Sequence, residues 1–396
     1  MTARNTRALV IVVGALVVIA AAAAVVQLAR PPFAAPSPSA PQARAFSARI
    51  VVSVPRAGAR RAQSEGVIDA VRLAVSEVSA HVNAGAVTYL VEVDVRNSAT
   101  DAGEWSAELE RANSEAAAAD ASVVAYIGPS TVDAARVVAP IAAKAGLAVV
   151  TPTITNPALT QRGFDDRLYD AVHPGGATVL VRTIPSDAVA GRAMAKWAID
   201  RKLSPTAAIE DAWSKAFAQA VTAAPAGGTP FVYLGGMPAE AAAERTRALR
   251  DRPGGVEIGG AESILSDAFV ERAGAAAAGV VATFPGRPAE QYEGAAALFE
   301  RAYLNAYAIA PDPYAIFGYD AARLVLDALA RSQQTFTLDR AKVREAIFAT
   351  KDLSGALGTW SVEANGDSTY ATEQLYVVRS LPNGQLAWLW DSEIRP

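Results

Sequence analysis

Two segments rich in hydroxyl side chains each follow a short apolar run of the kind that forms a buried strand. Ser130 and Thr131 lie in the first segment, and Thr153 and Thr155 lie in the second. Hydroxyl groups and the free N–H groups at the start of a helix can hold a carboxylate, whereas an acidic side chain can hold an ammonium group. Ligands of open α/β sheets collect at the carboxyl ends of strands. The two segments therefore predict a site for a small polar molecule.

The residues on which most enzymes depend are scarce in this sequence. Its 396 residues include no cysteine and only two histidines, His81 and His173, and it contains none of the common catalytic or nucleotide-binding motifs. The net charge is −4, with 36 basic and 40 acidic side chains, and no long basic run is present to bind nucleic acid. We therefore expect no enzyme activity, no metal and no cofactor.

Short β-branched runs alternate with alanine-rich segments of helical period, which predicts an α/β protein built from βα units. The predicted strands are 50–54, 89–95, 123–127, 148–150, 207–209, 231–234 and 280–284. The predicted helices are 66–79, 103–118, 132–145, 188–200, 214–223, 239–250, 291–308, 316–330 and 339–349.

The N-terminal segment has the character of a membrane anchor. Residues 9–26 are all apolar, the stretch continues to 29, and Arg4 and Arg7 precede it in segment 1–8. By the positive-inside rule the N-terminus would stay in the cytoplasm, and the domain that follows would be exported on a single-pass membrane helix. A cleavable signal peptide, which would leave a secreted protein, is the other interpretation. Residues 30–45 are rich in Pro, Ala and Ser and predict an extended linker.

Several longer strings fall in an order that resembles the leucine/isoleucine/valine-binding-protein family, the type I substrate-binding proteins of branched-chain amino-acid ABC transporters. The resemblance extends over about 47–378. The strings are Gly128-Pro129-Ser130-Thr131, Thr151-Pro152-Thr153-Ile154-Thr155-Asn156-Pro157, Pro185-Ser186-Asp187, Ile209-Glu210-Asp211-Ala212-Trp213-Ser214, Tyr233-Leu234-Gly235-Gly236, Gly260-Ala261-Glu262, Tyr314 with Tyr319-Asp320-Ala321-Ala322, and Gly355 to Asp367.

The resemblance implies a two-lobed type I periplasmic-binding-protein fold. Each lobe would be a mostly parallel sheet flanked by helices, and three hinge strands would join the lobes. Lobe 1 would comprise 46–184 and 287–364, and lobe 2 would comprise 185–286 and 365–396. The implied function is capture of an amino acid or similar small polar ligand between the lobes, for an ABC permease or for sensing.

The same resemblance implies roles for individual residues. Thr155 matches a carboxylate-binding threonine, Thr153 a position that contributes its backbone, and Glu262 an acid that binds the ligand ammonium. Trp213 and Tyr314 match aromatic wall positions, and Asp187 begins the helix after the first crossover. Most of these residues also have a structural interpretation: a turn for the threonines, packing for Trp213, a helix cap or first-turn acid for Asp187 and a solvated loop for Glu262. The segment 319–322, just beyond Tyr314, is predicted to serve helix packing.

The sequence departs from the family pattern at the start of the helix 132–145. Val132 stands where the family usually has a ligand-binding serine, and Asp133 adds a negative charge to the first turn. Ser130 and Thr131 are candidate ligand contacts, but Ser130 and Asp133 also form a capping-box-like pattern. Because the changes remove a hydroxyl and add a charge that repels a carboxylate, a ligand-poor interaction or sensor module with the same fold is the alternative function.

Overall fold

The computed structural model describes residues 44–396 apart from 85–86, 222–227, 333 and 335–336. The predicted cytoplasmic segment 1–8, the predicted anchor 9–29 and nearly all of the predicted linker 30–45 lie outside the described residues. Within the described residues, none of the helices combines the length and the apolar character that crossing a membrane requires.

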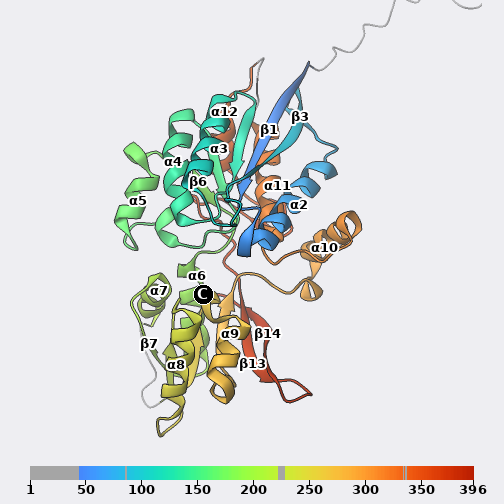
Figure 1. Cartoon of the computed structure of the whole chain (residues 1–396). Coiled ribbons are helices and arrows are strands. Elements are labelled where there is room, and N and C mark those ends of the chain that lie inside the picture. The colour runs from blue at the N-terminus through green and yellow to red at the C-terminus, as the bar shows by residue number, and fades with distance from the viewer. Residues whose placement is uncertain (1–43, 85–86, 222–227, 333, 335–336) are drawn as a thin grey trace, which may run out of the picture. The chain divides into compact units, whose positions relative to one another are not determined.

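A first lobe is built on a six-stranded sheet of order β2-β3-β1-β4-β5-β6 (Figure 1). Strands β1, β4, β5 and β6 pair in parallel, and β2 pairs with β3 antiparallel. The strands are β1 (Arg44–Val54), β2 (His81–Ala84), β3 (Val87–Asn97), β4 (Val123–Ile127), β5 (Ala148–Thr151) and β6 (Leu180–Arg182).

Helices cover both faces of this sheet because the side chains of its central strand alternate between two apolar clusters. Ile50 and Val52 face one cluster, to which α2, α10, α11 and α12 contribute, while Val51 faces the other, which α3, α4 and α5 complete. The helices are α2 (Arg61–Glu77), α3 (Ala107–Ala119), α4 (Val132–Ala145), α5 (Asp166–Val172), α10 (Gly294–Tyr307), α11 (Ala315–Arg331) and α12 (Arg340–Phe348).

A second lobe is built on a sheet of order β14-β13-β10-β9-β8-β7, in which β7 to β10 are parallel and β13 and β14 antiparallel. Helices α6 and α7 pack on one face, and α8 and α9 on the other. The elements are α6 (Asp187–Asp200), β7 (Ser204–Ala207), α7 (Ala212–Ala220), β8 (Pro230–Tyr233), α8 (Ala239–Arg250), β9 (Glu257–Gly260), α9 (Asp267–Ala273), β10 (Val281–Phe284), β13 (Glu373–Ser380) and β14 (Leu386–Ile394).

Short elements complete the structure. The one-turn 3-10 helices are η1 (Gly58–Arg60), η2 (Pro157–Leu159), η3 (Pro174–Gly176), η4 (Glu262–Ile264), η5 (Gly274–Ala277) and η6 (Ala289–Gln291). A hairpin of β11 (Leu353–Gly355) and β12 (Gly358–Trp360) is held on α11 by buried Asp320, which accepts hydrogen bonds from Ala356 N at 2.6 Å and from Trp360 Nε1 at 2.8 Å. Asp320 therefore has a packing role, as predicted for the segment 319–322.

The structure has the predicted two-lobed α/β fold. The prediction that strands form the hinge is wrong. The chain passes between the lobes at 183–186, 285–293 and 361–372, and none of these described segments is a strand. Pro185 and Pro285 lie in two of them, and proline has no N–H to donate to a strand ladder. The lobe boundaries at 184, 286 and 364 stay a prediction.

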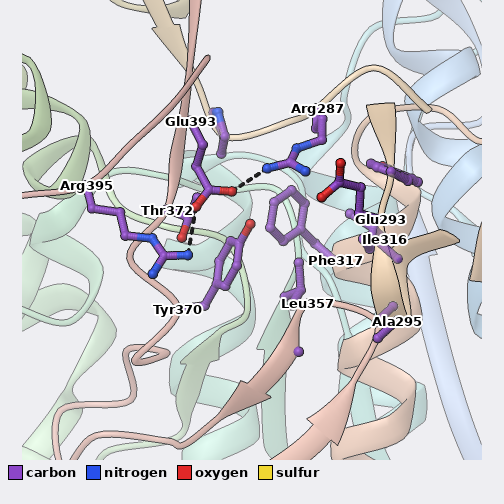
Figure 2. A pocket seen from close by; sticks show the side chains of 15 residues that line it. Arg287, Glu293, Ala295, Ile316, Phe317, Leu357, Tyr370, Thr372, Glu393 and Arg395 are labelled. Carbon is purple, nitrogen blue, oxygen red and sulfur yellow. Dashed lines mark hydrogen bonds and ion pairs between the residues drawn. The ribbon is translucent and has the colours of Figure 1, made fainter. Parts of the chain in front are cut away.

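A hollow of about 190 Å³ lies beside the second and third of these crossings (Figure 2). Its lining includes Arg287, Tyr292, Tyr370, Glu393 and Arg395. Glu393 forms ion pairs with both arginines, with a separation of 2.7 Å from Arg395. Glu293 also lines the hollow, so two arginines and two glutamates balance and the lining has no net formal charge.

Candidate ligand-binding site

Four of the eight predicted site residues come together at one small pocket between the lobes. Thr155, Asp187, Trp213 and Glu262 all line it, and the other lining residues are Pro185, Ser186, Ala190, Thr283, Pro285 and Glu373. The side chains leave about 10 Å³ of free volume, which is the space of about one water molecule. The site is thus polar and almost filled by its own side chains.

The pocket residues lie where strands end and helices begin. Thr155 is in the loop that follows β5, and Asp187 is the first residue of α6, immediately after the first crossing. The Asp187 backbone N–H donates to the Thr155 carbonyl at 2.8 Å, which fixes the two segments against each other. Glu262 follows β9, and Thr283 lies in β10. This arrangement is the one expected for ligand sites in parallel sheets.

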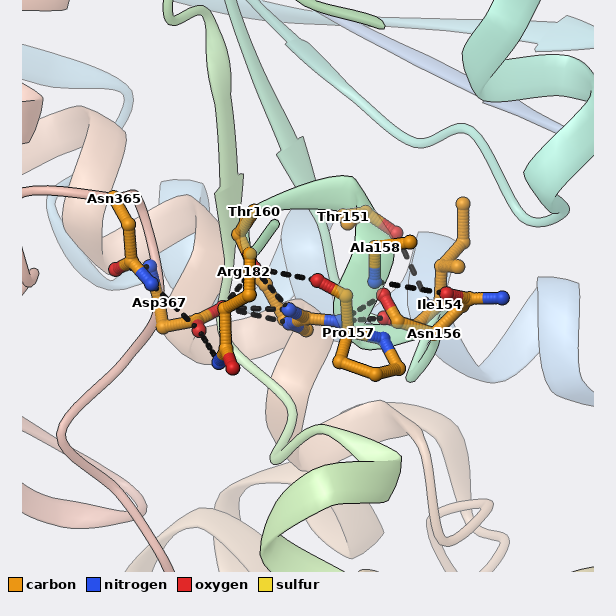
Figure 3. Close-up of polar contacts among 10 residues, drawn as sticks. Thr151, Ile154, Asn156, Pro157, Ala158, Thr160, Arg182, Asn365 and Asp367 are labelled. Carbon is orange, nitrogen blue, oxygen red and sulfur yellow. Dashed lines mark hydrogen bonds and ion pairs between the residues drawn. The ribbon is translucent and has the colours of Figure 1, made fainter. Parts of the chain in front are cut away.

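The loop that carries Thr155 is held in place by a buried ion pair that sequence reasoning did not identify (Figure 3). Arg182, with 1% of its side chain exposed, contacts Asp367 at 2.6 Å. The same guanidinium donates to the Asn156 carbonyl at 2.7 Å and to the Ile154 carbonyl at 3.4 Å. Burial raises the pKa of Asp367, but Arg182 and the hydrogen bonds outweigh this effect, so the pKa lies below its usual value. Asp367 is therefore ionised and anchors the loop through Arg182.

Three carboxyl groups meet at the pocket. Asp187 is 4% exposed, Glu373 is 1% exposed, and Glu262 is partly buried. Burial raises the pKa of Asp187 to about 8, with Glu262 and Asp211 adding repulsion that the Thr155 hydroxyl and Arg182 only partly offset. Burial, followed by repulsion from Glu262 and Asp187, raises the pKa of Glu373 well above its usual value. The ligand-free site therefore holds protons that isolated carboxylates would release.

Glu262 is linked to the first lobe through Tyr314, the residue that precedes α11. The Tyr314 hydroxyl donates a hydrogen bond to Glu262 Oε2 at 3.3 Å. Burial raises the pKa of Glu262, while this hydrogen bond and the charge of Arg60 lower it in part. Tyr314 thus reaches the site through Glu262, and the structure brings these two predicted residues together.

Trp213 is held against the pocket by a glycine. The Trp213 ring packs so closely on Gly236 that a Cβ at position 236 would lie 2.3 Å from the ring. Asp211, which caps α7, binds the Gly236 N–H at 2.7 Å and the Ser214 N–H at 2.7 Å. The glycine pair after β8 therefore sets the position of the aromatic wall.

The other three predicted residues, Ser130, Thr131 and Thr153, do not line this pocket. The Thr131 hydroxyl caps α4 by accepting from the Ala134 N–H at 3.2 Å. The capping-box interpretation based on Ser130 is wrong, because α4 begins at Val132 and the cap is therefore Thr131. Ser130 is buried, and the ligand contacts predicted for these three residues stay predictions.

Val132 and Asp133, at the point of departure from the family pattern, form the first turn of α4. Val132 packs against the apolar cluster of α3, α4 and α5, and Asp133 is the acidic residue of that turn. Neither residue lines the pocket. Their effect on amino-acid recognition stays a prediction.

Glu373, Thr283 and Ser186 are pocket residues that sequence reasoning missed. Each carries a buried side-chain oxygen that has no hydrogen-bond partner among the described residues: Glu373 Oε2, Thr283 Oγ1 and Ser186 Oγ. Ser186 lies beside Asp187 in a string that the resemblance included, which was the available signal. No comparable signal pointed to Glu373 in the C-terminal strand β13. Among the residues described, no group of His, Asp or Glu is arranged to hold a metal ion.

Comparison with known proteins supports the fold. A family described as "Receptor family ligand binding region" matches residues 67–198, which is less than half of the chain. A comparison with curated protein sequences found no match.

Solved structures match over most of the chain. The leucine-binding protein LivK of Thermotoga maritima is 22% identical with a TM-score of 0.62, and the match covers 88% of this chain and 99% of that one. A substrate-binding protein of an ABC transporter from Desulfitobacterium hafniense, solved with Leu, is 18% identical with a TM-score of 0.63 and covers 87% and 100%.

A solute-binding protein from R. palustris, solved with benzoate, is 15% identical with a TM-score of 0.57 and covers 87% and 96%. The resemblance noted in the sequence is thus confirmed at the level of the fold. This chain has the two-lobed type I fold of ABC-transporter substrate-binding proteins.

Proposed function

We propose that this protein is a solute-binding protein that captures a small polar ligand between its two lobes without transforming it. The observation that carries the proposal is the convergence of Thr155, Asp187, Trp213 and Glu262, from segments far apart in the sequence, on one polar pocket. Structural neighbours that were solved with leucine or benzoate support a ligand of this size. Because the pocket is almost full, the lobes would separate to admit the ligand and close over it.

The same proposal includes a second step, in which the protein passes the ligand to an ABC permease or signals that the ligand is present. Structural neighbours from Desulfitobacterium hafniense and R. palustris are binding proteins of ABC transporters, and the apolar run 9–26 would tether the domain outside the cytoplasm by a single membrane helix. Protease accessibility of the domain in intact cells tests this location. Complete protection until the membrane is permeabilised would contradict it.

The proposed ligand capture is tested by thermal unfolding of the full-length protein with a panel of amino acids, amides, amines and small carboxylic acids. A ligand that binds only the folded state raises the midpoint temperature as its concentration rises. Thr155→Ala and Glu262→Gln should remove the increase, while Glu244→Gln on the exposed surface of α8 should not. If no compound in the panel shifts the midpoint, ligand capture is contradicted.

A ligand-poor interaction module is the second candidate, and the small free volume of the pocket favours it. The polar lining argues against it. Buried oxygens without hydrogen-bond partners are rare in folded proteins, and a ligand in the cleft would supply the missing partners. Movement of the lobes on ligand addition distinguishes the solute-binding protein from the interaction module. Small-angle scattering that shows contraction on addition of a panel ligand supports capture, and an unchanged profile with every compound supports the module.

A further inference from the structure

The ionisable side chains that line the pocket between the lobes are all acids. Asp187, Glu262 and Glu373 line it, and no lysine, arginine or histidine among the described residues does so. The remaining lining consists of hydroxyl groups, apolar side chains and the Trp213 ring. Carboxylates attract cations, and an aromatic ring attracts a cation placed over its face.

Unpartnered oxygens provide an independent sign that a ligand with N–H groups belongs here. Glu373 Oε2 and Thr283 Oγ1 have no hydrogen-bond partner among the described residues, and both residues are 1% exposed. Ser186 Oγ, in a residue that is 4% exposed, is unpartnered in the same way. Burial raises the pKa of Glu373, so its carboxyl group holds a proton while the pocket is empty. Once ionised, it can only accept hydrogen bonds, so the ligand group that then satisfies it must be a donor. An ammonium or guanidinium group is such a donor.

No basic side chain among the described residues lines this pocket to pair with a ligand carboxylate, and the hydroxyl groups of Thr155, Ser186 and Thr283 are the uncharged donors in the lining. The Thr131 hydroxyl already caps α4, and Asp133 places a negative charge in the first turn of that helix. Arg60 is the basic residue whose charge acts on Glu262, but it is exposed, is hydrogen-bonded to Gln63 and does not line the pocket. A carboxylate in the pocket would face three acidic side chains.

We propose that the pocket selects a small organic cation, a protonated amine or guanidinium without a carboxylate, over the corresponding α-amino acid. This inference rests on the proposed function and names its class of ligand. Glu262 and Glu373 bind the cationic N–H groups, and the Trp213 ring forms the wall beside them. Binding of the cation displaces protons from Asp187 and Glu373, because a nearby positive charge favours the ionised form of a carboxyl group.

The test uses pairs of compounds that differ only in the carboxylate. Isoamylamine and leucine, putrescine and ornithine, and agmatine and arginine are titrated into the full-length protein by calorimetry. An amine would form charge-assisted hydrogen bonds with the pocket acids and has no carboxylate for them to repel. At least one amine should therefore bind about 10- to 100-fold more tightly than its amino acid. Equal or tighter binding of the amino acid in every pair overturns the inference, as does absence of binding by all the amines.

The result also separates this inference from the proposed function. If leucine or benzoate binds while the amines do not, the choice of ligand class is wrong and ligand capture stands. If none of these compounds and no member of the wider panel binds, both fail.

Variants identify the groups that make the selection. Glu373→Gln keeps the shape of the side chain and removes its charge, so the preference for the amine should fall about tenfold or more. Glu244→Gln, an exposed change of the same kind, should leave the preference unchanged. Titration in buffers of different ionisation enthalpy should show proton release on amine binding, reduced in Glu373→Gln. A purely structural role for Glu373 would lower stability without changing proton release, and that result contradicts the proposal.

Discussion

The Tyr314 hydroxyl donates to Glu262 Oε2 at 3.3 Å and so connects the start of α11 in the first lobe with the loop after β9 in the second. The contact gives a partly buried carboxylate one of its partners. It also ties the most acidic part of the pocket to an element that belongs to the opposite lobe. Changes at Tyr314 should therefore act through the ionisation of Glu262.

Tyr314→Phe should reduce the free energy of unfolding by about 1 kcal/mol, the usual contribution of one hydrogen bond. Because this bond favours ionised Glu262, whose pKa is raised by burial, the loss should grow as the pH rises above the ordinary glutamate pKa of 4.5 and Glu262 loses its proton. Urea unfolding at several pH values measures it. Tyr307→Phe is the matched control, since the Tyr307 hydroxyl donates to the Asp69 carbonyl at 2.7 Å and that acceptor does not titrate. Identical pH profiles for the two variants would contradict the assignment.

Asp187→Asn should change how stability depends on pH. In the wild-type protein the folded-state pKa of Asp187 is raised from 3.8 to about 8, so the folded state retains a proton that the unfolded state releases. The free energy of unfolding should then fall by up to about 1.4 kcal/mol per pH unit between about pH 4 and pH 8. The variant lacks this contribution and should show a shallower fall. A wild-type slope that the substitution leaves unchanged would be inconsistent with a protonated Asp187.

Breaking the pair between Arg182 and Asp367 should be costly, because it leaves a charge buried without its partner. Arg182→Met should lower the free energy of unfolding by about 3–5 kcal/mol. The exposed pair of Arg162 and Asp170, whose side chains are 60% and 63% exposed, is the comparison, and Arg162→Met should cost at most about 1 kcal/mol. Chemical unfolding of both variants measures the difference. Similar losses for the two would show that the buried pair does not anchor the loop of Thr155.

Asp320→Asn should weaken the attachment of the β11–β12 hairpin. The carboxylate accepts from the N–H groups of Ala356 and Leu357 and from the Trp360 indole, and an amide presents its own N–H to one of these donors. The expected loss is about 1–3 kcal/mol. Asp327→Asn on the exposed side of the same helix should change stability by at most about 0.5 kcal/mol. Urea unfolding followed by circular dichroism would measure the effect, and an unperturbed transition would rule it out.

Periodicity predicted the longer helices well, since helices such as 132–145 and 239–250 carry a continuous apolar face, but it missed the seven-residue helices α5 and α9. It missed the two long C-terminal strands, β13 and β14, and it missed strands whose sequences are short or polar. Strand β6 has three residues and ends in Arg182, and β9 ends in two glycines that are needed because a Cβ at Gly259 would lie 2.5 Å from the Phe231 ring. Strand β7 starts at Ser204 rather than at the predicted 207, because its residues are largely exposed.

The candidate site, like the fold, could be predicted from the sequence only in part. Thr155, Asp187, Trp213 and Glu262 belong to strings that resemble a known family, so their convergence could be anticipated from order alone. Glu373 could not be anticipated in this way. It begins β13, which lies beside β10 in the interior of the second sheet, and only this pairing buries an acid that the sequence shows as an ordinary polar strand residue.

The most direct test of the account is to identify what the pocket holds. The full-length protein is purified without added solute, and any small molecule bound to it is released and identified by mass spectrometry, for the wild type and for Glu262→Gln. We expect the wild type to carry a stoichiometric small cation that Glu262→Gln lacks. A wild-type protein that carries no small molecule, and to which none binds on addition, would contradict the claim that this pocket is a ligand site.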